Sequence, residues 1–174
     1  MRLKTIPLYA VLAFAACTSP NQSSNMTEDY TQYVNPFIGT DFTGNTYPGA
    51  QVPFGMVQLS PDNGLPGWDR ISGYFYPDST IAGFSHTHLS GTGAGDLYDV
   101  SFMPVTLPYK EAEAPLGIHS KFSHANESAY AGYYQVKLDD YNINVELTAT
   151  ERCGIQRYTF PKAEAVIFLN LSKA

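Results

Sequence analysis

The chain contains 174 residues, of which 44% are hydrophobic and 14% aromatic, and its formal net charge is −6. No run of Lys or Arg occurs along it, which excludes nucleic acid as a partner. An acidic sequence rich in aromatic, Gly and Pro residues is compatible instead with neutral sugars, because aromatic faces and carboxylates make most contacts to them.

Residues 1–16 have the composition of an export signal. Arg2 and Lys4 precede a mostly apolar stretch, Ile6–Phe14, and small residues follow it up to Ala16. At about nine residues, the apolar stretch is well short of the roughly 20 that a membrane-spanning helix needs. We therefore expect a signal peptide that is removed and a protein that is exported.

Phe14-Ala15-Ala16-Cys17 resembles the bacterial lipobox, in which the cysteine is acylated and becomes the new N-terminus. Phe14 stands where leucine is usual, so cleavage to a free soluble protein is the alternative. We expect a lipid on Cys17, which would attach the protein to the cell envelope, in the periplasm, at the outer membrane or at the cell surface. The polar residues 17–29 predict a flexible tether. Cys153 then has no partner for an intrachain disulfide.

Residues 30–174 predict one globular domain whose N-terminal half is rich in loops. Between Asn35 and Pro108, Gly and Pro recur every few residues and leave room only for short strands, such as Val52–Leu59 and Val100–Thr106. Loops whose ends are fixed by a sheet are where binding groups usually lie.

The C-terminal third has the alternation of an antiparallel sheet. Apolar and polar residues alternate in Tyr134–Leu138 and in Ile143–Thr148, and the turn-forming segment Asp139–Asn142 between them predicts a hairpin. Ile155–Phe160 predicts a third strand. The continuous apolar run Ala165–Leu171 predicts a fourth strand that is buried on both faces.

These elements predict an all-β fold, an antiparallel β-sandwich with long Gly/Pro-rich loops at one edge. The chain ends shortly after a strand of the buried type, and a strand with uncovered apolar faces is a liability. We therefore expect an incomplete sandwich, truncated by a gene-model break or a fragmentary source sequence.

A glycine-hinged loop around Gly44 and Asn45 also carries Asp41 and Tyr47. Gly44 allows backbone angles, and a close approach of a ligand, that other residues resist. The loop is a candidate sugar-binding element, and a structural turn is the alternative interpretation.

Trp68 is the only tryptophan and precedes Asp69 in a Gly/Pro-rich loop. An indole beside a carboxylate is a common way to hold a pyranose, because the ring stacks on the sugar while the acid accepts hydrogen bonds. The alternative is that Trp68 fills a gap in the core.

His86 and His88 would point to the same side of an extended segment, as zinc ligands on strands do. A zinc site needs a third ligand, for which the sequence offers His119, His124 and Cys153 but no HExxH pattern. We therefore favour contacts to a substrate, or hydrogen bonds that brace the loop, over a metal-hydrolase site.

No Gly-x-Ser-x-Gly motif predicts a serine nucleophile. An acid and base pair for glycoside cleavage could come from carboxylates in the loops, although sequence gives no separation between them. These carboxylates are Asp41, Asp69, Asp96 and Asp99.

Five ordered blocks together resemble glycoside hydrolase family 92. They are Val34–Thr40, Gly44–Ala50, Pro53–Asp62, Gly83–Gly91, and Glu146–Arg152 with Arg157–Pro161. The resemblance extends from about Tyr33 to the last residue.

The resemblance implies the N-terminal β-sandwich of a calcium-dependent, exo-acting α-mannosidase that inverts the anomeric centre, packed against a C-terminal (α/α)6 barrel. In that family the general acid Glu and the base Asp come from the barrel. We therefore expect no catalytic residue in this chain, no turnover by the chain alone, and calcium ligands that lie outside it.

The resemblance also implies that this domain forms part of the wall of a pocket for mannose-containing glycans. The residues expected to face the sugar or to brace the pocket are Trp68, Asp69, Gly44, Asn45, His86 and His88. A stand-alone carbohydrate-binding module without catalysis is the alternative function.

Overall fold

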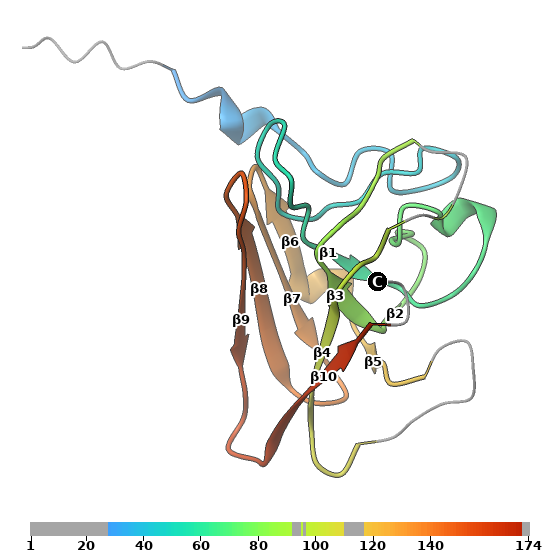
Figure 1. The fold of residues 1–174 in the computed structure, drawn as a ribbon, viewed down its shortest axis with the longest axis vertical. Coiled ribbons are helices and arrows are strands. Elements are labelled where there is room, and N and C mark those ends of the chain that lie inside the picture. Colours follow the sequence, from blue (N-terminus) through green and yellow to red (C-terminus); the bar gives the residue numbers. More distant parts are fainter. Residues whose placement is uncertain (1–27, 92–94, 96, 110–116, 172–174) are drawn as a thin grey trace, which may run out of the picture.

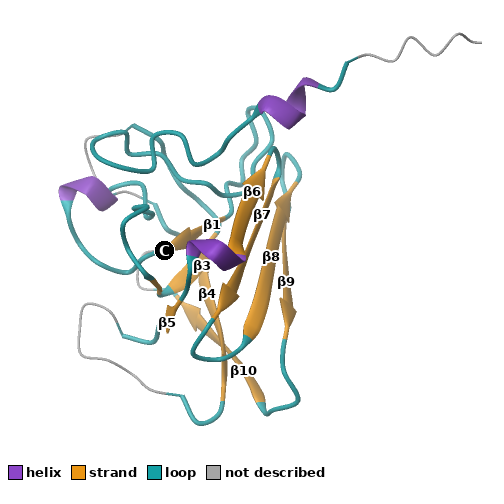
Figure 2. Cartoon of the chain, turned by 180° about the vertical axis from the view of Figure 1, so that it is seen from behind, coloured by secondary structure: helices purple, strands orange, loops and turns teal. Residues whose placement is uncertain are grey.

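The computed structural model describes residues 28–91, 95, 97–109 and 117–171. The expected signal peptide, the lipidation site at Cys17 and nearly all of the tether lie outside the described residues. Within them, the chain forms two four-stranded antiparallel sheets, a two-stranded ribbon and single turns of 3-10 helix (Figures 1 and 2). No helix of this part has the length and the apolar character needed to span a bilayer.

The two sheets have the strand orders β1-β3-β4-β10 and β6-β7-β8-β9, and β2 pairs with β5 in the ribbon. In chain order the elements are η1 (Tyr30–Tyr33), β1 (Ser60–Asp62), η2 (Trp68–Arg70), β2 (Thr80–Ile81), β3 (Gly83–Ser85), β4 (Ser101–Thr106), β5 (Ser120–Lys121), η3 (His124–Asn126), β6 (Glu127–Tyr130), β7 (Tyr133–Leu138), β8 (Ile143–Ala149), β9 (Gly154–Thr159) and β10 (Ala165–Asn170). The predicted all-β fold is confirmed.

The predicted hairpin is formed by β7 and β8. Leu138 pairs with Ile143 across the turn, in which Asn142 takes a positive φ of 53°. Asn tolerates this left-handed conformation better than most residues, because its short side chain bonds locally. The third predicted strand is β9, which pairs with β8 along its whole length.

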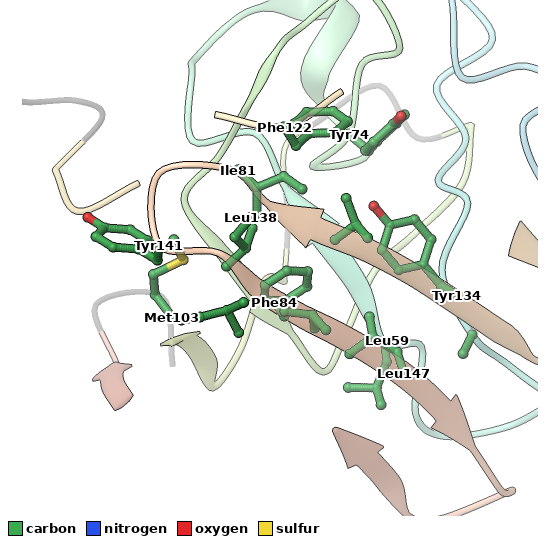
Figure 3. Packing of buried hydrophobic residues seen from close by; sticks show 14 of the residues in the cluster. Leu59, Tyr74, Ile81, Phe84, Met103, Phe122, Tyr134, Leu138, Tyr141 and Leu147 are labelled. Carbon is green, nitrogen blue, oxygen red and sulfur yellow. The ribbon is translucent and has the colours of Figure 1, made fainter. Parts of the chain in front are cut away.

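The core lies between the inner faces of the two sheets (Figure 3). It contains alternate residues of β7 and β8 together with residues of the opposite sheet and the ribbon: Tyr134, Val136, Leu138, Ile143, Val145, Leu147, Leu59, Ile81, Phe84, Met103 and Val105. Full burial of each large aliphatic or aromatic side chain contributes about 1.5–3 kcal/mol, so the alternation in the sequence determines which face turns inward.

A buried carboxylate, Glu127, joins the loops to the sheet. Its side chain accepts hydrogen bonds from the hydroxyls of Tyr134 (2.6 Å) and Tyr74 (3.0 Å) and from Nδ1 of His124 (2.6 Å). Burial and then the charge of Glu127 raise the pKa values of both tyrosines well above the ordinary range. The other ring nitrogen of His124 lies 2.7 Å from the carbonyl oxygen of Tyr76. The imidazole also stacks on the phenol ring of Tyr76.

The prediction of a strand at Val52–Leu59 is wrong, because this segment turns. Pro53 has no N–H to donate, and Phe54 takes a positive φ of 60°. The backbone N–H of Gly55 closes the turn on the carbonyl of Val52, and only Leu59 forms an isolated bridge, to Ala50. Regular pairing begins at β1.

The prediction that Ala165–Leu171 is buried on both faces is also wrong. β10 pairs with β4 at the edge of its sheet, and Val166 and Phe168 pack against the core. Ile167, Leu169 and Leu171 point the other way and are 49%, 52% and 55% exposed. An apolar run therefore produces a strand that is covered on one face in this chain.

Candidate functional site

A cleft of about 810 Å³ lies beside the sheet β1-β3-β4-β10. Its walls come from Asp62 at the end of β1, from the loop around η2, and from β4 and β10. Figure 1 shows the long loops of the N-terminal half lying across one end of the sandwich, next to β1. The lining includes Asp62, Gly67, Arg70, Gly73, Tyr98 and Phe168.

Asp62 is held from behind by the buried His88. Oδ1 of Asp62 lies 2.9 Å from Nε2 of His88, and Nδ1 of the same ring lies 2.8 Å from the carbonyl oxygen of Gln58. The ring thus has a hydrogen-bond partner at each nitrogen, a backbone carbonyl on one side and a carboxylate on the other. Ser85 Oγ, 3.1 Å from Nε2, completes the surroundings. The imidazole is fully buried, whereas the carboxylate that it contacts reaches the cleft.

Aromatic rings and a glycine fix the position of this pair. The ring of Tyr47 lies 5.1 Å from that of His88, and the ring of Tyr98 lies 5.8 Å away, edge on. Gly73 has a φ of +89°, and a Cβ placed there would lie 2.6 Å from Oδ1 of Asp62. Only glycine suits both the backbone angle and the space.

Trp68 and Asp69 lie on η2, beside the cleft wall formed by Gly67 and Arg70. Trp68 is 61% exposed, so the interpretation that it fills the core is wrong. Arg70 holds this turn in place, because its guanidinium donates two bonds to Asp78, with 2.6 Å between Nε and Oδ2. These hydrogen bonds raise the pKa of Arg70.

Gly44 and Asn45 lie in a tight loop that contacts the histidine-bearing segment. A Cβ on Gly44 would lie 2.3 Å from the carbonyl oxygen of Gly39, so the loop closes on itself here. The backbone N–H of Gly91 donates to the carbonyl of Asn45 at 2.7 Å. The buried Oδ1 of Asn45 has no hydrogen-bond partner among the described residues.

His86 and His88 have different partners and form no shared site. β3 ends at Ser85, and Nδ1 of His86 lies 2.9 Å from the carbonyl oxygen of Val100 while its ring packs edge on against Phe102. Within the described ranges, no three His, Cys, Asp or Glu side chains come together as a metal site would require.

Two of the four candidate catalytic carboxylates, Asp41 and Asp99, have structural partners. Asp41 accepts from the backbone N–H of Phe42, and Asp99 accepts from the hydroxyl of Thr87. Asp69 lies on η2, and Asp96 is outside the described residues. Sequence reasoning missed Asp62 and the Arg70–Asp78 pair, for which the available signal was a carboxylate placed where a strand meets a Gly-rich loop.

Comparisons with known proteins agree with this architecture. The sequence profile of the glycosyl hydrolase family 92 N-terminal domain matches residues 33–174. An α-mannosidase of family GH92 from Bacteroides thetaiotaomicron, solved in complex with mannoimidazole, is 45% identical with a TM-score of 0.77, and the match covers 82% of this chain and 20% of that chain.

Two further relatives are more distant. An inverting mannosidase of family GH92 from the same organism is 32% identical with a TM-score of 0.68, over 84% of this chain and 20% of that chain. An uncharacterized secreted glycosidase of Arthroderma benhamiae is 31% identical over 143 residues, which are 79% of this chain and 18% of that protein.

The chain thus spans about a fifth of the length of each of these relatives. The matched residues include the loops of the cleft as well as the strands of the sandwich. The chain belongs to glycoside hydrolase family 92, of which it carries the N-terminal domain.

Proposed function

We propose that this chain is the N-terminal part of an exo-acting α-mannosidase that hydrolyses α-mannosides of glycans with inversion. The observation that carries the proposal is the 45% identity, over 82% of the chain, to an α-mannosidase that was solved with mannoimidazole. Inversion rests on the 32% identity to an inverting mannosidase.

In this proposal the chain binds and orients the sugar but supplies neither the acid nor the base. Trp68 offers an exposed indole face for stacking, and Asp69 beside it accepts hydrogen bonds from hydroxyls. Asp62, held by His88, presents a fixed carboxylate at the cleft. Gly44, Asn45 and His86 do not line the cleft, so in this proposal they brace the loops, Asn45 through its backbone bond to Gly91 and His86 through Val100.

An inverting glycosidase needs two carboxyl groups about 6.5–9.5 Å apart with water between them. Four of the described carboxylates, Asp62, Asp78, Glu127 and Glu146, are paired with basic side chains. We expect the acid and the base from the part of the longer relatives that this chain does not span, as the resemblance to the family implies.

The calcium ion that the family implies does not fit the described residues. Calcium takes 6–8 oxygen ligands, usually with several carboxylates among them. Asn45 provides one unpartnered buried oxygen, but no group of three His, Cys, Asp or Glu side chains gathers in the described ranges. We expect its ligands elsewhere in the enzyme.

We further propose that the protein is exported and anchored to the cell envelope by a lipid on Cys17. The basic, apolar and small residues of positions 1–16 support export, and so does the similarity to a relative described as secreted. Mass spectrometry of the mature N-terminus tests the anchor. An acylated Cys17 at the N-terminus is expected, and a different, unmodified N-terminal residue would contradict it.

The function is tested by measuring hydrolysis of an aryl α-mannoside and of mannose oligosaccharides. This chain is compared with a longer polypeptide that spans the full length of the relatives. The longer polypeptide is expected to release mannose, to lose activity on calcium chelation, and to lose about tenfold or more in kcat/KM in Trp68→Ala, since a sugar-stacking aromatic is worth on the order of 1–2 kcal/mol. Tyr33→Ala, at another exposed aromatic, is the matched control.

Turnover by the 174-residue chain alone would contradict the division of labour. If the chain alone and the longer polypeptide both bound mannosides without cleaving them, the alternative of a carbohydrate-binding module would replace the proposal.

A further inference from the structure

The outer face of the sheet β6-β7-β8-β9 carries an ordered set of side chains that the cleft does not use. Because alternate residues of β7 and β8 face the core, the intervening residues face outward. The register places Ser128 opposite Gln135, Gln135 opposite Glu146, and Glu146 opposite Arg157. Four hydrogen-bonding side chains thus form one row across four strands.

A second row contains two aromatic rings. Tyr130 pairs with Tyr133, and Tyr133 pairs with Thr148. The two rings stack with centroids 4.6 Å apart and an interplanar angle of 14°, and Tyr130 is 55% exposed. Residues two apart on a strand are about 6.8 Å apart, so this aromatic row lies directly beside the polar row.

Three residues of the polar row, Ser128, Gln135 and Glu146, line a shallow groove of about 550 Å³, together with Lys137 and Asn144. Within it the charge of Glu146 is neutralised by the two-pronged bond from Arg157, with 2.6 Å between Nε and Oε2. The hydroxyl of Tyr133 donates to the same carboxylate at 2.5 Å. These bonds hold the side chains of the two rows in one arrangement, in which the carboxylate is paired.

Flat aromatic surface next to fixed, charge-compensated hydrogen-bonding groups is the chemistry that recognises a neutral sugar chain. A pyranose places its C–H face on a ring and its hydroxyls against amide, carboxylate and guanidinium groups. Anionic polymers would instead meet the paired carboxylate of Glu146, and an apolar protein partner would leave the polar row desolvated.

We propose that this face is a second glycan-binding site, in which Tyr130 and Tyr133 stack on pyranose rings while Gln135, Asn144 and Arg157 bond their hydroxyls. It shares no lining residue with the cleft, which is built on the other sheet. Figure 2 shows β6–β9 along one side of the molecule, with β1, β3 and β4 on the other side. That the glycan contains mannose rests on the proposed function, and the site would hold a polymer near the pocket.

The experiment measures binding of soluble α-mannan by affinity electrophoresis, for the chain and for the longer polypeptide, with alginate as the anionic comparison. Tyr130→Ala and Tyr133→Ala are compared with Tyr33→Ala, an exposed tyrosine elsewhere. Tyr133→Phe, which keeps the ring and loses the bond to Glu146, covers the case in which an alanine variant fails to fold, and near-UV circular dichroism checks each fold.

Mannan binding is expected to weaken about tenfold in each alanine variant and by less in Tyr133→Phe, since stacking carries most of the contact. Hydrolysis of a small aryl α-mannoside by the longer polypeptide should not change. Folded alanine variants that bind mannan as tightly as Tyr33→Ala would overturn the site, and so would binding of alginate as tight as that of mannan. Mannan binding that depends on Tyr130 in a polypeptide without hydrolysis would refute the proposed function and leave this site standing.

Discussion

Asp62 reaches the cleft with its carboxylate 2.9 Å from the fully buried ring of His88, which is anchored at its other nitrogen by the carbonyl of Gln58. The segment that holds Gln58 and Asp62 and the segment that holds His88 therefore meet at one imidazole. The position of the Asp62 carboxylate at the cleft wall therefore depends on this contact.

Replacing His88 by Ala should lower the free energy of unfolding by about 3–5 kcal/mol, because Asp62 and the carbonyl of Gln58 would lose a buried hydrogen-bond partner and the ring would leave a cavity. Urea unfolding measures this loss. His119→Ala is the control, since its ring is partly exposed and its described hydrogen bond is a local one to Gly117. Equal losses in the two variants would show that the Asp62–His88 pair has no special weight.

Gly73→Ala tests how closely the backbone approaches Asp62. The substitution adds backbone strain at φ +89° and places a methyl group 2.6 Å from Oδ1 of Asp62, whereas Gly91 has a similar φ of +69° and nothing within 4 Å of its would-be Cβ. Backbone strain should lower the free energy of unfolding by about 1–2 kcal/mol in both variants. The contact with Asp62 should lower it further in Gly73→Ala. Thermal unfolding of the two variants measures the difference. A lower melting temperature for Gly73→Ala than for Gly91→Ala is expected if Asp62 crowds the site, and equal melting temperatures would contradict the crowding.

The Arg70–Asp78 pair is expected to control the mobility of η2. Asp78→Asn removes one arm of the two-pronged bond and should cost about 1–2 kcal/mol, since both side chains are mostly buried. Because Trp68 is the only tryptophan, its fluorescence anisotropy reports on the turn directly and should fall. Arg157→Gln, which breaks a pair at a far more exposed arginine, should leave the anisotropy unchanged.

Alkaline pH should destabilise the fold through its buried tyrosines. Burial and the charge of Glu127 raise the pKa values of Tyr74 and Tyr134, and burial with Glu146 raises the pKa of Tyr133 to about 12. A raised folded-state pKa means that the stabilisation is complete below the unfolded pKa of about 10 and is lost as the pH rises above it.

As the pH is raised, the midpoint of urea unfolding should therefore change little through tyrosine ionisation up to about pH 9 and should fall steeply above about pH 10. Tyr134→Phe should start lower, by about 1–2 kcal/mol, because Glu127 loses a donor, but should show a shallower alkaline slope. An unchanged slope would mean that Tyr134 does not titrate in the unfolding reaction.

The sequence predicted β7, β8 and β9, in which apolar and polar residues alternate, but it did not predict β6. In β7 and β8 the alternation is strict, and the turn at Asp139–Asn142 matches the register observed. Val52–Leu59 looked like a strand because of its apolar residues, yet Pro53 and the positive φ of Phe54 bend it. The short β2, β3 and β5 are fixed by pairing with distant segments, which no local pattern records.

The site was harder to predict because its geometry depends on contacts distant in the sequence. The spacing of His86 and His88 indicates a common side only if the strand continues, and β3 ends at Ser85. Asp62 gains its role from a histidine 26 positions later, which periodicity does not reveal. The exposure of Trp68 agrees with its predicted place in a loop, whereas its contact with sugar stays a prediction.

Glu127 receives bonds from Tyr74 just after the cleft-wall residue Gly73, from His124 in η3 and from Tyr134 near the start of β7. Opening the cleft wall would therefore remove the Tyr74 hydroxyl from a carboxylate inside the sandwich. The hydrogen bonds from His124 and Tyr134 to the same carboxylate would then be weakened as well. Amide protons of the wall and of β7 should consequently exchange with deuterium at similar rates, as one cooperative unit, so that the cleft is kept in shape by the same event that keeps the domain folded.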